Sequence, residues 1–172
     1  VQWVPAGMKA VRTAFDQYRE VYQRTKPAVA KPHMGLMREI YVAASDKKAR
    51  AEARDHWIYF WQRRGGGRTY GGHDQGGVST LLDGGRKQEL LDMERSIADG
   101  SFICGSPDSA AKQIKAIATQ AGADTFLGEF TFGALEHGQA MSSLKLFTDE
   151  VMPALRQFDV DALNFPKVEP RA

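Results

Sequence analysis

The chain has 172 residues, of which 42% are hydrophobic and 26% are charged, a composition typical of a soluble globular protein. Its 23 basic and 21 acidic residues leave a net charge of +2, too small an excess for a dedicated nucleic-acid-binding protein. The single cysteine, Cys104, excludes an internal disulfide framework and a zinc site of several thiolates built by this chain alone.

The N-terminus shows no signal-peptide pattern, and no run of about 18 apolar residues exists, so we expect no membrane span. Together with the lone cysteine, these features favour a cytoplasmic location. The first residue is Val1 and not Met, which is consistent with a processed or partial chain.

Apolar periodicity predicts two helices and one strand in the first third of the chain. Residues 8–24 form the first helix, with one apolar stripe made of Met8, Val11, Phe15, Tyr18 and Tyr22. Pro27 and Pro32 separate it from residues 38–43, a β-branched and aromatic run that predicts a strand. Ser45 is the expected N-cap of the next helix, which runs to about Arg64. Its expected buried stripe consists of Ala49, Ala53, Trp57 and Phe60.

Residues 65–77 contain seven of the 17 glycines, more than any helix or strand tolerates. We therefore expect a mobile loop over residues 63–85. Five side chains on it have chemistry suited to a ligand: Arg63, Arg64, Arg68, Tyr70 and His73. The glycines are not followed by Gly-Lys-Ser/Thr, so a phosphate-binding loop is excluded.

The second half of the chain alternates helices and strands. Helices are expected over residues 86–98, 107–121 and from about 138, and strands over residues 101–104 and 124–128. Ser106 and Pro107 start the second of these helices, and Gly122 ends it. The last helix has an apolar stripe, interrupted by Pro153, that consists of Met141, Leu144, Phe147, Val151 and Leu155.

Strands that alternate with helices in this way predict parallel βαβ units. Three parallel strands leave two open sheet edges, and a closed (β/α)8 barrel needs eight strands. The sequence therefore predicts part of a larger barrel or sheet, or a sheet completed by a partner. We assign residues 1–163 to this partial domain and expect a flexible tail over residues 164–172.

The second half also resembles a known family. The runs Phe102-Ile103-Cys104-Gly105-Ser106-Pro107, Ala111-Lys112-Gln113-Ile114 and Ala121-Gly122-Ala123-Asp124-Thr125-Phe126 resemble the seventh strand, seventh helix and eighth strand of the bacterial luciferase-like monooxygenases. Phe132-Gly133, His137, Ser143–Phe147 and Val151–Leu155 are similar to the closing helix region, and Tyr18–Glu20 and Arg38–Ala43 to the sixth-strand region. The resemblance covers about residues 4–156, which correspond to the C-terminal half of family members.

The resemblance implies an α/β fold in which this chain supplies the C-terminal part of a (β/α)8 barrel, left incomplete here. It also implies reduced FMN as cofactor, or F420 in one branch, bound at the C-terminal face of the strands. The monooxygenases form a flavin hydroperoxide with O2 and oxygenate a small-molecule substrate, and a partner reductase supplies the reduced flavin. We expect no nucleic acid or membrane partner. A homo-oligomer or a complementing N-terminal half would complete the barrel.

In such a barrel, functional side chains follow the strands. Glu129 is the candidate catalytic residue, and Gly105 and Ser106 are candidates for cofactor binding at a helix N-terminus. Phe130 and Phe132 are candidates for an apolar substrate wall. The alternatives are a solvated loop carboxylate, a plain N-cap turn and core packing, respectively.

The resemblance also places the loop over residues 63–85 where family members carry an active-site lid, with arginines that could clamp an anion; a surface insertion is the alternative. No metal site is expected, because the four histidines share no ligand spacing. Cys104 is expected to be a buried thiol. Three functions remain open: a flavin monooxygenase, of which this chain is an inactive part, an F420-dependent oxidoreductase, and a non-catalytic half-barrel that assembles with a partner.

Overall fold

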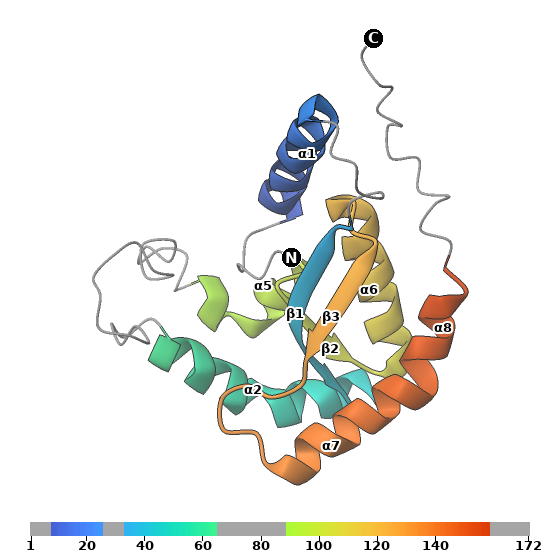
Figure 1. Cartoon of the computed structure of the whole chain (residues 1–172). Helices are drawn as coiled ribbons and strands as arrows, with labels where there is room; N and C mark the ends of the chain where they lie inside the picture. The colour runs from blue at the N-terminus through green and yellow to red at the C-terminus, as the bar shows by residue number, and fades with distance from the viewer. Residues whose placement is uncertain (1–7, 26–32, 65–88, 159–172) are drawn as a thin grey trace.

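Three parallel strands form the only sheet within residues 8–25, 33–64 and 89–158, the part of the chain that this computed structural model describes (Figure 1). The strands are β1 (Gly35–Val42), β2 (Phe102–Gly105) and β3 (Thr125–Glu129). Strand β1 lies in the centre, with β2 on one side and β3 on the other. Val42 of β1 lies beside Gly105, and Glu39 lies beside Glu129.

Helices cover both faces of β1 and β2. Since the side chains of a strand alternate between faces, β1 contributes residues to two cores. One core contains Leu36, Ile40 and Val42 of β1, packed against α6 (Pro107–Ala121) and against the π-helical turn η1 (Phe147–Val151). The other contains Tyr41 and Ala43, packed against α2 (Asp46–Arg64) and α5 (Met93–Ala98). The described part is therefore a mixed α/β fold with a three-stranded parallel sheet.

The strand order differs from the expectation drawn from the family resemblance. Counting these strands as sixth, seventh and eighth of a barrel places β2 between β1 and β3, which is wrong for this structure. The reason is the path of α6, which packs on all three strands and carries the chain from β2 across β1 to β3. The described strands thus form an open sheet.

The expected helix after β1 is confirmed, with one change in its buried stripe. Ser45 Oγ accepts a hydrogen bond from the Lys48 N–H at 3.2 Å and so caps α2. Ala49, Ala53 and Trp57 are fully buried, but the fourth buried residue is Trp61, while Phe60 is half-buried. Buried residues therefore recur every four positions along α2. The rings of Phe60 and Trp61 both pack on Trp57.

The expected helix over residues 86–98 is interrupted in the structure at Asp92. Within the described residues, a single helical turn at 89–91 ends at Asp92, and α5 then begins at Met93. Asp92 accepts a hydrogen bond from the Arg95 N–H at 3.1 Å, which makes it an N-cap. Leu90 and Met93 are buried on either side of this break.

Helix α6 matches its prediction at both ends. The Ser106 hydroxyl accepts a hydrogen bond from Ser109 N–H, and Pro107 is the first helical residue. Gly122 ends the helix with φ 73°, a left-handed conformation that glycine adopts without strain.

The last helical region begins with α7 (His137–Leu146), passes through η1 and ends with α8 (Met152–Arg156). Pro153 lies at the start of α8, and its missing N–H is consistent with the wider π-helical turn before it. The expected stripe is partly wrong, because Met141 is 48% exposed. The buried face instead carries Ala140, Ser143, Phe147 and Val151.

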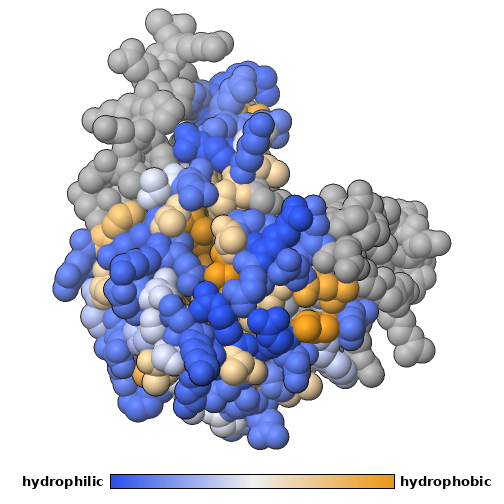
Figure 2. All heavy atoms as spheres, turned by 180° about the vertical axis from the view of Figure 1, so that it is seen from behind, coloured by the Kyte–Doolittle hydropathy of each residue, from blue (hydrophilic) through white to orange (hydrophobic). Residues whose placement is uncertain are grey.

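Helix α1 (Met8–Thr25) packs against α6. Met8, Val11 and Phe15 are buried as expected, whereas Tyr18 is 54% exposed and Tyr22 is half-buried. Seen from behind, the surface is mainly hydrophilic with separate apolar patches (Figure 2). Within the described ranges, no helix is long and apolar enough to cross a membrane.

Candidate functional site

The carboxyl ends of the three strands lie at the same end of the sheet, where parallel α/β folds place their ligands (Figure 1). Strands β1 and β2 end level with each other, and the Ala43 N–H donates to the Gly105 carbonyl at 3.1 Å. Strand β3 ends three residues earlier along β1, beside Glu39. The candidate site therefore has two parts, one at the junction of β1 and β2 and one at the end of β3.

A carboxylate of the chain itself occupies the junction of β1 and β2. Asp46, the first residue of α2, accepts a 2.7 Å hydrogen bond from the Ser106 N–H at Oδ1. Its Oδ2 accepts a 2.9 Å bond from the Ser109 hydroxyl. These two hydrogen bonds hold the pKa of Asp46 below its usual range, and the bond from the Ser106 N–H has the larger effect. The N-terminus of α6, where the sequence suggested an anion, is thus bound by Asp46.

Gly105 allows this approach. A Cβ atom at position 105 would lie 2.8 Å from Cβ of Ser109 and 2.9 Å from Oδ1 of Asp46. The close contact expected at Gly105 is therefore present, but its partner is Asp46. The structure places Gly105 and Ser106 in a turn that ties α2 to α6, and a phosphate there would have to displace the carboxylate.

An ion-pair group continues from Asp46 along α2. Arg50 donates to Glu94 at 3.0 Å, and Arg54 donates to the other oxygen of Glu94 at 3.1 Å. The hydrogen bond with Glu94 raises the pKa of Arg50. All three side chains are partly exposed, so the group links α2 to α5 at the surface and adds little stability.

Cys104 is fully buried beside this junction, as expected. Burial raises the pKa of its thiol to about 12, so the nucleophilic thiolate is absent at neutral pH. Tyr41, which lies beside Cys104 in the sheet, donates a 3.0 Å hydrogen bond to Glu52. Burial and this bond raise the pKa of Tyr41. Neither group is poised to act as a base or nucleophile.

The end of β3 presents a different environment. Glu129 is half-buried and lies directly beside Glu39 of β1, so both side chains occupy the same face of the sheet. Glu39 is only 3% exposed. Leu127, two residues before Glu129 and on the same face, is 37% exposed. Two neighbouring carboxylates beside an exposed leucine are the chemically most distinctive feature at this end of the sheet.

Phe130 and Phe132 do not share a wall. Phe130 packs against Phe147 of η1, with ring centroids 5.2 Å apart, in the core on one face of the sheet. Phe132 packs edge-on against Phe102 at 5.3 Å and Trp57 at 6.1 Å, in the core on the other face. Core packing, the alternative considered for both residues, is the arrangement present.

The chain between Phe132 and α7 is fixed by a close backbone contact. Gly133 has φ 61°, and a Cβ there would lie 2.2 Å from the His56 carbonyl oxygen. This glycine lets the loop after β3 lie against α2. The same contact holds Phe132 over the aromatic cluster made of Trp57, Phe60, Trp61 and Phe102.

The expected lid falls largely outside the described residues. Arg63 and Arg64 are the last residues of α2, and their side chains are not described; Arg68, Tyr70 and His73 lie outside the described ranges. Helix α2 has 19 residues and spans roughly 28 Å, so its end lies far from Asp46. The lid therefore stays a prediction.

The sequence analysis gave no functional role to the two acidic residues that define these parts, Asp46 and Glu39. Glu39 carried a signal, because a glutamate inside an otherwise apolar strand predicts a buried charge with a special role. Its neighbour Arg38 is also buried, and donates to the carbonyls of Gly100 and Met37, both at 2.8 Å. Among the described residues, no group of three or more His, Cys, Asp or Glu side chains could hold a metal ion.

Comparison with known proteins gives two findings. The model of a family described as luciferase-like monooxygenase matches residues 2–125, more than half of the chain. Among solved structures, the chain is similar to monooxygenase RslO1 from Streptomyces bottropensis, with a TM-score of 0.60 and 16% sequence identity. That similarity covers 86% of this chain and 39% of the other chain. No curated protein matches the chain significantly.

Proposed function

The chain belongs to the luciferase-like monooxygenase family, and on this premise we propose that it is part of a flavin-dependent monooxygenase. The whole enzyme would use reduced FMN and O2 to oxygenate a small organic substrate. When bound, the reduced flavin would supply the two electrons that oxygenation by O2 requires, and a flavin reductase would regenerate it. The match of the family model to residues 2–125 carries this proposal.

The isolated chain would be an incomplete and inactive part. It spans 39% of the structurally similar monooxygenase, and its described sheet has three strands. In the active protein, further strands would pair with the outer edges of β2 and β3 and complete the sheet; a regular (β/α)8 barrel has consecutive strands as neighbours, which the order β2-β1-β3 does not match. A complementing N-terminal half, or a second copy of the chain, would supply them.

The N-terminus of α6 does not fit a flavin phosphate. The helix N-terminus at Ser106 donates its N–H to Asp46, and a second negative charge beside this carboxylate would be repelled. Residues outside the described ranges, or in the complementing half, would therefore bind the phosphate of the cofactor. F420 stays the alternative cofactor, and hydride transfer without O2 would then be the reaction.

Glu129 keeps its proposed role as the residue that contacts flavin or substrate. It is half-buried, and it lies beside the buried Glu39 at the uncovered end of β3. A carboxylate in this position could accept a hydrogen bond from a bound molecule. Phe130 and Phe132 pack in separate cores, so a preference for apolar substrates would have to arise from other side chains.

The first test is to read the coding sequence upstream of the Val1 codon and to express the longest in-frame protein. We expect this protein, but not the 172-residue chain, to bind reduced FMN in an anaerobic spectral titration. With substrate and O2 it should consume one O2 for each product molecule.

The outcomes separate the three functions. Binding of reduced F420 in place of FMN, with substrate reduction that is independent of O2, would replace the monooxygenase proposal by the hydride-transfer alternative. Failure to bind either cofactor would favour the non-catalytic assembly module. For all three functions we propose a cytoplasmic location.

A further inference from the structure

A partly enclosed cavity lies at the end of the sheet opposite to the candidate site. Its volume is about 160 Å³, and α6, β3 and the end of α8 surround it. Leu36 lies near the start of β1, and Thr125 and Phe126 begin β3. From Leu36 to Val42 the strand spans about 20 Å, so the cavity is separate from the junction of Asp46 and Ser106.

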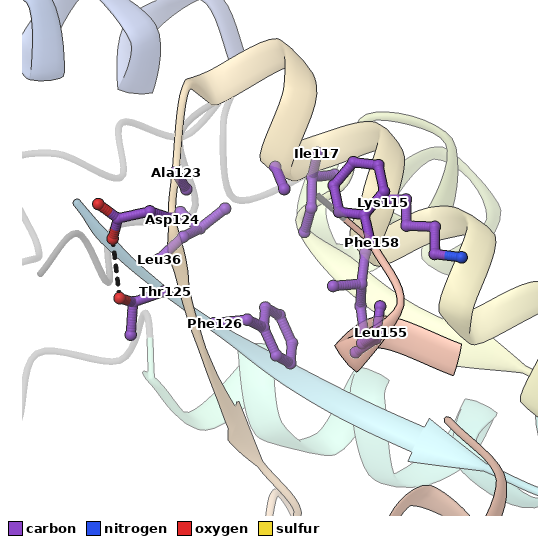
Figure 3. A pocket seen from close by; sticks show the side chains of 11 residues that line it. Leu36, Lys115, Ile117, Ala123, Asp124, Thr125, Phe126, Leu155 and Phe158 are labelled. Atoms are coloured by element: carbon purple, nitrogen blue, oxygen red, sulfur yellow. Dashed lines mark hydrogen bonds between the residues drawn. The ribbon is translucent and has the colours of Figure 1, made fainter. Parts of the chain in front are cut away.

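The walls of this cavity are mainly apolar. Figure 3 shows the side chains of Phe126 and Leu155 directed into the same space, with Leu36 and Ile117 near them and Phe158 at its border. The size is close to that of an engineered protein cavity of about 150 Å³ that stays dry and binds benzene. A single small ring or a short alkyl chain therefore matches both the volume and the surface.

Two charged residues line the cavity, and they differ in how they are compensated. Asp124 is satisfied by its own neighbours: its Oδ1 accepts from the Met34 N–H at 3.0 Å and from the Thr125 hydroxyl at 2.8 Å. His33 lies 3.5 Å from its other oxygen. The Asp124 and Thr125 side chains also lie on the side of β3 away from Phe126 and Leu155 (Figure 3).

Lys115 is different. Its ammonium lies 5.7 Å from the centroid of the Phe158 ring at the border of the cavity. Among residues 8–25, 33–64 and 89–158, no carboxylate forms an ion pair with it. By contrast Lys112, one turn earlier on α6, is bound to Asp108 at 2.6 Å. Within the described residues, the charge beside the cavity that lacks an ion-pair partner is therefore positive.

From this arrangement we propose that the cavity binds a small monocarboxylate with an aromatic ring or a short alkyl chain. The apolar body fills the space between Phe126 and Leu155, and the carboxylate pairs with the Lys115 ammonium. This site does not depend on the proposed flavin chemistry, because it shares no residue with the candidate site at the carboxyl ends of the strands.

The test uses benzoate as the probe and benzyl alcohol as its uncharged analogue, titrated into the full 172-residue chain and followed by amide chemical shifts. We expect saturable binding of benzoate with the largest shifts at Ile117, Ala123 and Phe126. Lys115→Gln should weaken benzoate binding roughly threefold to fivefold and leave benzyl alcohol unchanged, since a partly exposed ion pair contributes that much. Lys112→Gln is the matched control and should change neither.

A second variant tests the location. Ala118 lines the cavity and is half-buried, so Ala118→Phe would fill the space from the α6 side. Loss of benzoate binding with retained cooperative unfolding supports the site. The proposal is overturned if benzoate does not saturate, if the shifts lie elsewhere, or if Ala118→Phe or Lys115→Gln leaves its affinity unchanged.

Discussion

The two strands that flank β1 are held in different ways. All four residues of β2 are buried, since α2 and α5 cover one face and α6 covers the other. In β3, by contrast, Thr125, Leu127 and Gly128 are exposed, and only the face toward α6 and η1 is packed. Helices thus cover both faces of the sheet on the β1–β2 side, whereas one face of β3 is uncovered on the β1–β3 side.

This difference bears on where function can lie. On the β1–β2 side, Asp46 satisfies the helix N-terminus that could have bound an anion. On the β1–β3 side, Glu129 and Leu127 remain accessible beside the buried Glu39. A ligand or a complementing chain would therefore meet the molecule at β3, and changes on the two sides should affect different properties.

The largest expected effect comes from the aromatic core on the β1–β2 side. Trp57 is fully buried, stacks on Phe102 at 4.1 Å and donates to the Leu90 carbonyl at 2.7 Å. Trp57→Ala should lower the free energy of unfolding by about 3–5 kcal/mol, measured by urea denaturation. Tyr59→Ala, on the same helix and 39% exposed, should cost less than about 1 kcal/mol. Equal losses for the two variants would contradict this assignment of the core.

A pair of glycines gives the second test. Gly105→Ala would place a Cβ 2.8 Å from Ser109 and 2.9 Å from Asp46, so we expect a loss of about 1–3 kcal/mol. Gly138 lies in α7 with no atom within 4 Å of its Cβ position. Gly138→Ala should therefore stabilise the protein, by about 0.5–1 kcal/mol. Thermal unfolding of both variants measures the difference, and the same sign for both would show that the Asp46 contact is not tight.

The sequence predicted local structure well, because the signals that set helix ends lie within a few residues. Ser106 and Gly122 mark α6 correctly for this reason. The buried residues of α2 and α7 were predicted wrongly where two adjacent residues are both hydrophobic. Phe60 and Trp61, or Met141 and Ala140, cannot be separated until the packing partner is known.

Long-range features could not be read in this way. The Asp46–Ser106 bond joins residues 60 positions apart, and nothing near Asp46 distinguishes it from an ordinary acidic residue in a first helical turn. The order of β2, β1 and β3 depends on the path of α6 across the sheet, which an alternating pattern of helices and strands does not fix.

A smaller effect is expected from the Asp46 carboxylate, and it depends on pH. Because the folded protein lowers the pKa of Asp46, its stabilisation is present above the unfolded pKa of about 4. It is lost as the pH falls through the folded value. Asp46→Asn should cost about 1 kcal/mol at neutral pH, as for other helix caps, and much less in acid. Urea denaturation from pH 7 to pH 3 measures this.

Asp149 is the matched control for Asp46. The pKa of Asp149 is also lowered, by its bond with Lys145, but both groups are exposed to solvent. Asp149→Asn should therefore leave the stability nearly unchanged across the same pH range. A pH-independent loss in Asp46→Asn would mean that Asp46 acts through packing and not through its charge.

The smallest expected change in stability, but the clearest change in association, comes from β3. Leu127 is 37% exposed on an edge strand, where a lysine is the natural device against pairing. If β3 pairs with a second copy or a complementing half, Leu127→Lys should abolish that association and cost less than about 0.5 kcal/mol. Met141→Lys, at an exposed position on α7, should leave association intact. Light scattering measures the molar mass of both variants. If β3 pairs with another strand, only Leu127→Lys should lower the molar mass; if β3 is uncovered but unpaired, the two variants should have the same molar mass.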